Sequence, residues 1–82
     1  MVYEVEFSEI VKKNLDAIEK TQAVRILKKI REITENPERY IKKLVESDLC
    51  SLRVGDYRVL LIIKYPTIFI VKIGHRSKVY EK

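Results

Sequence analysis

The chain has 82 residues, enough for one domain with a single hydrophobic core and too few for a second domain. Its composition, 46% apolar and 35% charged with two Gly and two Pro, excludes a disordered or low-complexity chain. No apolar run approaches the roughly 18 residues of a membrane span, and the N-terminus does not have the pattern of a signal peptide. We therefore expect a cytoplasmic protein without membrane contact.

The cysteine and histidine content argues against metal binding. The single cysteine, Cys50, cannot form an internal disulfide, and the chain has one histidine, too few for a Cys/His zinc site. The sequence also lacks a glycine-rich loop of the kind that holds phosphates. We expect neither a metal ion nor a cofactor.

The basic charge is concentrated in the last 34 residues. Residues 1–48 contain ten acidic and ten basic side chains, whereas residues 49–82 contain two acidic and seven basic ones, an excess of five that equals the net charge of +5. Such segregation favours a polyanionic partner, most often a nucleic acid. The alternative is a solvated basic sheet edge that deters aggregation.

The first part of the chain predicts a strand and a helical hairpin. Alternating β-formers at 2–7 indicate the strand, and Ser8 is a suitable N-cap for a helix over 8–20. Thr21 is a candidate N-cap for a second helix, which ends before Asn36-Pro37. Apolar residues recur at helical spacing, namely Val11, Leu15 and Ile18 in the first helix and Ala23, Ile26, Leu27, Ile30 and Ile33 in the second. Two such helices predict a hairpin that covers one face of a sheet.

The second part predicts strands over 49–54, 57–64 and 68–73, after an irregular connection at 37–48. We expect Gly74 to end the last strand. The connection has no clear period, and we expect some of its apolar side chains to point inward; the candidates are Tyr40, Leu44 and Val45.

Two arginines are predicted to face each other across the first hairpin. Gly55-Asp56 is typical of a two-residue turn, which places Arg53 opposite Arg58 on the same face of the sheet. Like charges in this position destabilise a sheet, so the pair indicates an anion site.

The second hairpin is predicted to bring a third cationic side chain to this pair. A two-residue turn at Pro66-Thr67 places His75 opposite Arg58, and one further loop residue would place Arg76 there instead. Either arrangement suits a phosphate, which the arginine fork binds well.

The segments LRVGDYR (52–58) and GHRSKVY (74–80), in this order after a strand and a helical hairpin, resemble the RelE/ParE superfamily of toxin–antitoxin toxins, and its RelE branch in particular. The resemblance covers residues 1–82 as one domain. It implies an α+β fold in which a helical hairpin packs on one face of an antiparallel sheet with an N-terminal strand. It also implies a type II toxin that cuts mRNA in the ribosomal A site and inhibits translation. The implied partners are the ribosome, mRNA and a RelB-like antitoxin, with which the toxin forms a hetero-oligomer.

The resemblance also implies roles for single residues. Attack of the RNA 2′-OH on the adjacent phosphate would proceed without a metal, with Arg58 stabilising the charged phosphate and Arg76 near the leaving oxygen. Tyr80 would orient the nucleotide and support proton transfer. Arg53 falls at a basic position that grips RNA. Apart from the resemblance, we expect further RNA contacts from Lys64, Lys78 and Lys82; Lys64 and Lys72 add at most long-range electrostatics.

One departure from the RelE pattern concerns the general base. RelE-type enzymes often carry two lysines before the arginine strand, and these positions are Leu49 and Ser51 here. We expect His75 to replace them, because imidazole can take or give a proton near neutral pH. Two alternatives stay open, a ParE-like toxin that binds DNA gyrase without cutting RNA and a plain RNA-binding module. The joint presence of Arg58, Arg76 and Tyr80 favours the nuclease.

Overall fold

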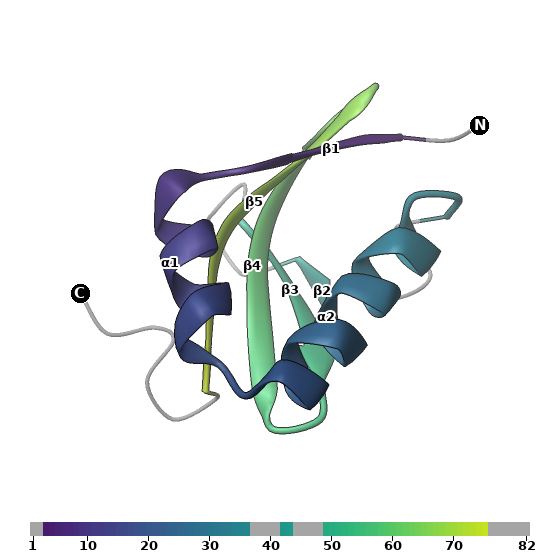
Figure 1. The fold of residues 1–82 in the computed structure, drawn as a ribbon. Coiled ribbons are helices and arrows are strands. Elements are labelled where there is room, and N and C mark those ends of the chain that lie inside the picture. The colour runs from purple at the N-terminus through teal and green to yellow at the C-terminus, as the bar shows by residue number, and fades with distance from the viewer. Residues whose placement is uncertain (1–2, 37–41, 44–48, 76–82) are drawn as a thin grey trace.

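The computed structural model describes residues 3–36, 42–43 and 49–75, which form an α+β fold (Figure 1). The elements follow in the order β1 (Glu4–Phe7), α1 (Glu9–Ala17), α2 (Lys20–Ile33), β2 (Lys42–Lys43), β3 (Cys50–Val54), β4 (Tyr57–Lys64) and β5 (Thr67–His75). The five strands form one sheet in the order β1-β5-β4-β3-β2. None of the helices in the described ranges is long and apolar enough to cross a membrane.

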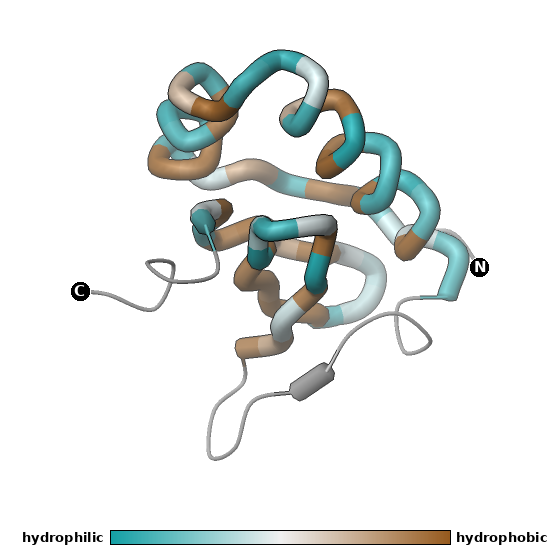
Figure 2. The backbone as a smooth tube through the Cα atoms, turned by 90° about the horizontal axis from the view of Figure 1, so that it is seen from below, coloured by the Kyte–Doolittle hydropathy of each residue, from teal (hydrophilic) through white to brown (hydrophobic). Residues whose placement is uncertain are grey.

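The helical hairpin covers one face of this sheet, so the predicted fold class is confirmed. In Figure 2 the two helices form one layer and the strands a second layer. The pairs β2–β3, β3–β4 and β4–β5 are antiparallel, whereas β1 runs parallel to β5. The sheet is therefore mixed, because β1 joins it beside β5 and runs parallel to that strand.

Strand boundaries agree closely with the predictions except in two places. The last strand runs to His75, so Gly74 lies inside it and does not end it. The connection 37–48 contains the two-residue strand β2 at 42–43, which pairs with the start of β3. Tyr40, Leu44 and Val45 lie outside the described residues.

The start of α1 confirms the predicted N-cap. The Ser8 Oγ accepts a hydrogen bond from the backbone N–H of Val11 at 3.1 Å and donates one to the Val71 carbonyl at 2.9 Å. Farther along α1, Asn14 Oδ1 accepts a bond from the Ile73 N–H at 3.0 Å. Since β1 pairs with β5 only as far as Ile70, these two side chains continue the hydrogen bonding along the edge of β5.

The start of α2 differs from the prediction. The helix begins at Lys20 with Glu19 as its N-cap, and no side chain caps it. Thr21 lies inside the first turn, and its hydroxyl donates to Glu19 Oε1 at 2.9 Å, so the predicted N-cap is wrong. The first helix is also shorter than predicted and ends at Ala17.

The core lies between the helices and the sheet. It is built from residues that alternate along the strands and recur along the helices, which include Val11, Ile26, Ile30, Ile33, Leu52, Val59, Leu61, Ile68, Ile70 and Ile73. Leu27 is 41% exposed and is not part of this cluster. Its position follows from helix geometry, because a residue next to Ile26 is turned about 100° around the axis from it.

Candidate functional site

The first hairpin has the predicted turn and register. Gly55 has a φ of +59°, a conformation that L-residues other than glycine rarely adopt. Arg53 pairs directly with Arg58. Because side chains alternate and Val59 belongs to the core, both arginines lie on the face away from the helices. We call this surface the arginine face.

The predicted register of the second hairpin is wrong. The turn lies at Tyr65-Pro66, so Thr67 already pairs within the ladder. A second shift falls between Leu60 and Leu61. At the end of the sheet that carries Arg53 and Arg58, the observed and predicted registers therefore differ by one residue. This difference moves the side chains of β5 to the opposite face.

This difference separates His75 from the arginine face. Gly74 lies opposite Arg58, and His75 lies opposite Tyr57. The rings of Tyr57 and His75 form an edge-to-face contact with centroids 5.9 Å apart. Tyr57 packs against the core on the helix side, so the register places His75 on that side as well.

Two lysines, on β4 and β5, also lie on the arginine face. Lys72 pairs with Leu60 on the arginine face, two residues along the ladder from the pair of Arg58 and Gly74. It is thus a diagonal neighbour of Arg58, about 7–8 Å away. Lys64 is on the same face at the far end of β4, about 20 Å from Arg58 at the usual rise per residue. Lys72 therefore lies much closer to Arg58 than Lys64 does.

Of the two family lysine positions, Ser51 is 4% exposed and lies opposite Leu60 on the arginine face. The predicted site residues Arg76, Lys78, Tyr80 and Lys82 lie outside the described residues. Within the described ranges, no group of three or more His, Cys, Asp or Glu side chains is placed to hold a metal ion.

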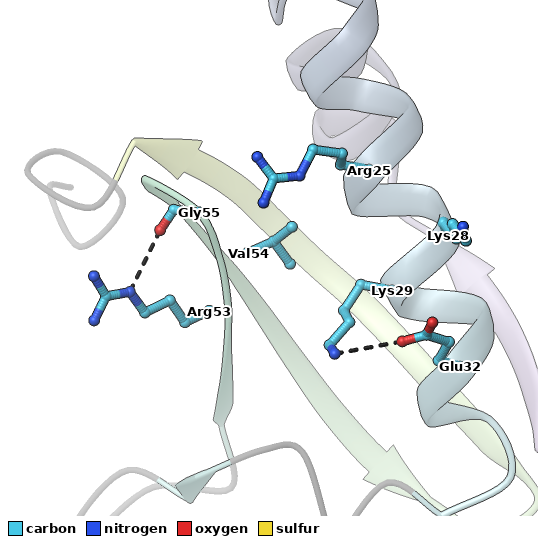
Figure 3. Close-up of a pocket in the computed structure, with 7 residues that line it drawn as sticks. All are labelled: Arg25, Lys28, Lys29, Glu32, Arg53, Val54 and Gly55. Atoms are coloured by element: carbon cyan, nitrogen blue, oxygen red, sulfur yellow. Dashed lines mark hydrogen bonds and ion pairs between the residues drawn. The ribbon is translucent and has the colours of Figure 1, made fainter.

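A basic groove between α2 and the β3–β4 hairpin was missed by the sequence analysis (Figure 3). It has a volume of about 390 Å³ and is lined by Arg25, Lys28, Lys29, Glu32, Arg53, Val54 and Gly55. We call it the α2–hairpin groove. A signal was present in the sequence, because α2 carries five basic residues and one acidic residue. Summing charge over residues 1–48 concealed it, since acids elsewhere in that segment offset the helix.

Arg53 is common to the groove and the arginine face. Its Nε donates to the Gly55 carbonyl at 3.4 Å, so the side chain is directed toward the turn. From the other side, Arg25 extends from α2 toward the hairpin (Figure 3), and its guanidinium lies 3.6–3.8 Å from where a Cβ on Gly55 would be. The two guanidinium groups therefore lie on either side of the same turn.

Comparison with known proteins gives a family and a fold. The family model of the ParE toxin of the type II toxin–antitoxin system parDE matches residues 5–80. The archaeal RelE–RelB complex from Pyrococcus horikoshii is similar at 28% identity and a TM-score of 0.80, over 96% of this chain and 100% of that one. The RelB–RelE complex from Methanococcus jannaschii is similar at 25% identity and a TM-score of 0.75, over 92% and 94%.

A third similar structure is the RelBE2 toxin–antitoxin complex from Mycobacterium tuberculosis, at 23% identity and a TM-score of 0.86, over 93% of this chain and 100% of that one. At this identity the likeness shows the fold. A comparison with curated proteins gives no match.

Proposed function

Because the chain belongs to the ParE toxin family of type II toxin–antitoxin systems, within the RelE/ParE superfamily, we propose that it acts as a RelE-type endoribonuclease that cuts mRNA on the ribosome. The observation that carries this proposal is the arginine face, where Arg53, Arg58 and Lys72 lie at neighbouring positions of three strands. Among the described residues, no carboxylate forms an ion pair with Arg53 or Arg58. Such a surface is suited to a phosphate.

The reaction we propose is attack of an RNA 2′-OH on the adjacent phosphate. The new O2′–P bond forms as the P–O5′ bond breaks, which leaves a cyclic phosphate and a 5′-OH; the 2′-OH loses its proton and the departing 5′ oxygen gains one. Arg58 would stabilise the added negative charge. It lies in β4, which has a strand on each side, so the backbone that carries the guanidinium is held before substrate arrives. Arg76 and Tyr80 are proposed to assist the leaving oxygen and the proton transfer.

Substitution of Arg58 tests this role. In a translation extract with labelled mRNA, we expect Arg58→Ala to cut about 10²–10³-fold more slowly than the wild type, the usual effect of removing one preorganised donor to a transition-state charge. Lys72→Ala should lose less, because lysine contributes a point charge and no fork. Lys13→Ala, an exposed change on α1 with the same loss of charge, is the control and should cut normally. Equal cutting by folded Arg58→Ala and wild type would refute the nuclease proposal.

The general base is a separate question. His75 is the candidate from the sequence, but the register places its side chain on the opposite face of the sheet from Arg58. His75→Ala in the same extract decides its role. A large loss with a changed pH–rate profile would support His75, whereas normal cutting would assign the 2′-OH proton to another group on the toxin or the ribosome.

Binding of DNA gyrase without RNA cleavage is a second candidate function. Two observations favour it, the match to the ParE family model and the buried Ser51 at a position where RelE-type enzymes often have lysine. A supercoiling assay with the same protein separates the two candidates. Inhibition of gyrase together with intact ribosome-bound mRNA would favour this function, and a protein that binds RNA but does neither would be a plain RNA-binding module.

We also propose that a RelB-like antitoxin is the partner that neutralises this chain. The similar structures from Pyrococcus horikoshii and Methanococcus jannaschii are complexes of RelE with RelB. On the outer side of α2, a depression of about 400 Å³ is lined by Val24, Leu27, Lys28 and Arg31. Two exposed apolar side chains with basic neighbours suit an amphipathic helix that carries acidic residues.

A further inference from the structure

We propose that the α2–hairpin groove is a second phosphate site, which holds the backbone of the same RNA strand as it continues from the arginine face around the edge of β3. The inference rests on the proposed function for the identity of the strand as RNA. It assigns a binding role to Arg25 and Lys28, which lie on a helix outside the arginine face.

The charge of the groove supports an anionic ligand. Of the seven described residues that line it, four are cationic and one is a carboxylate, Glu32, which pairs with Lys29 at 3.3 Å. Within the part of the chain that the structure describes, Arg25 and Lys28 form no ion pair. Bringing such groups together costs free energy through mutual repulsion, and an anion between them would offset that cost.

The position of Arg53 supports continuity between the two surfaces. In the described part of the sheet, β2 pairs with Cys50 and Ser51 and not with Arg53. The Arg53 side chain bends toward the turn through its bond to the Gly55 carbonyl and lines the groove, although its backbone position belongs to the arginine face. An RNA strand that contacts Arg58 and then Arg53 is thus led toward Arg25.

The lining of the groove favours phosphate over an acidic peptide. Among the described residues, Val54 is the only apolar side chain that lines it, and Val54 is itself buried in the core. Protein interfaces are depleted of lysine and rely on buried apolar anchors, which this groove lacks. Exposed apolar residues lie instead on the outer side of α2, at Val24 and Leu27.

The test measures salt dependence of binding and does not use cleavage. The probe is a single-stranded 12-mer RNA with 2′-O-methyl groups, which removes the attacking hydroxyl, titrated against the full chain by fluorescence anisotropy at several salt concentrations. The groove variant is Arg25→Gln with Lys28→Gln. The matched control is Lys12→Gln with Lys13→Gln, which removes the same charge from exposed positions on α1.

The plot of the logarithm of the association constant against the logarithm of the salt concentration has a negative slope. We expect the groove variant to make this slope less steep by about 1.4, because each phosphate contact on a single strand contributes about 0.7. The control should keep the wild-type slope. Equal slopes for the two variants, with both folded by circular dichroism, would overturn the inference.

Two further probes separate the other possible ligands. If the groove variant weakens binding of a 12-residue polyglutamate peptide but not of the RNA, the groove takes an acidic protein and the inference fails. If the effect appears only with a 12-base-pair RNA duplex, the site takes structured RNA and continuity with the arginine face is refuted. A changed slope in a protein that does not cut mRNA would refute the proposed nuclease and leave the groove as a phosphate site. An unchanged slope in a protein that does cut mRNA would refute the phosphate site in the groove and leave the nuclease proposal.

Discussion

Ser8 connects the beginning of the first helix to the last strand through a single hydroxyl group. It caps α1 and also donates to the Val71 carbonyl, 63 residues away in sequence. We expect Ser8→Ala to lower the free energy of unfolding by about 1–2 kcal/mol, because loss of an N-cap typically costs about 1 kcal/mol and a second hydrogen bond is lost with it. Urea denaturation measures the change.

Thr21→Ala is the matched control for this prediction. Thr21 has the residue type of an N-cap but lies inside α2, exposed, with its hydroxyl bonded only to Glu19 among the described contacts. Its removal should change the free energy of unfolding by less than about 0.5 kcal/mol, as is usual for surface positions. A loss at Thr21 as large as that at Ser8 would contradict the different roles given to the two hydroxyls.

At the scale of single elements, the β3–β4 hairpin depends on the left-handed conformation of Gly55. We expect Gly55→Ala to destabilise the protein by about 1–2 kcal/mol, because a Cβ clashes with the adjacent carbonyl oxygen in this conformation. Gly55→Asn should cost less, since asparagine tolerates the left-handed region. Thermal unfolding of the three proteins compares these costs, and equal stability of Gly55→Ala and wild type would contradict a strained turn.

Three sides of helix α2 have different roles. Its inner side contributes Ile26, Ile30 and Ile33 to the core, while Arg25 and Lys28 line the groove. Val24 and Leu27 are exposed on a third side. One helix can do this because successive residues project about 100° apart around its axis.

At the scale of the whole molecule, basic surface extends from α2 through Arg53 to Arg58 and Lys72. We expect the protein expressed alone to arrest growth and its co-expression with an acidic RelB-like protein from a neighbouring reading frame to restore growth, because a partner that covers these cations would exclude RNA. Growth curves and co-purification measure the two effects. Equal growth with and without the partner, with the wild-type chain shown to be folded, would argue against toxicity.

The sequence alone was sufficient for the local features of this fold. The helical and alternating apolar patterns and the capping serine predicted both helices and four of the five described strands, and the family resemblance implied the α+β class. It also predicted the pairing of Arg53 with Arg58, because Gly55-Asp56 defines a two-residue turn and the turn defines the register. These features depend on neighbours within a few residues along the chain.

The tertiary structure decided the composition of the site. It placed Lys72 beside Arg58, moved His75 to the helix side and brought Arg25 and Lys28 from α2 to the first hairpin. The second turn has no glycine that marks its position, and a register shift within a strand leaves no local pattern, so neither could be derived from the residues alone. A shift of one residue reverses the face of every side chain that follows. The sequence therefore determined which cations are present, and only the packing of strands and helix determined which of them lie together.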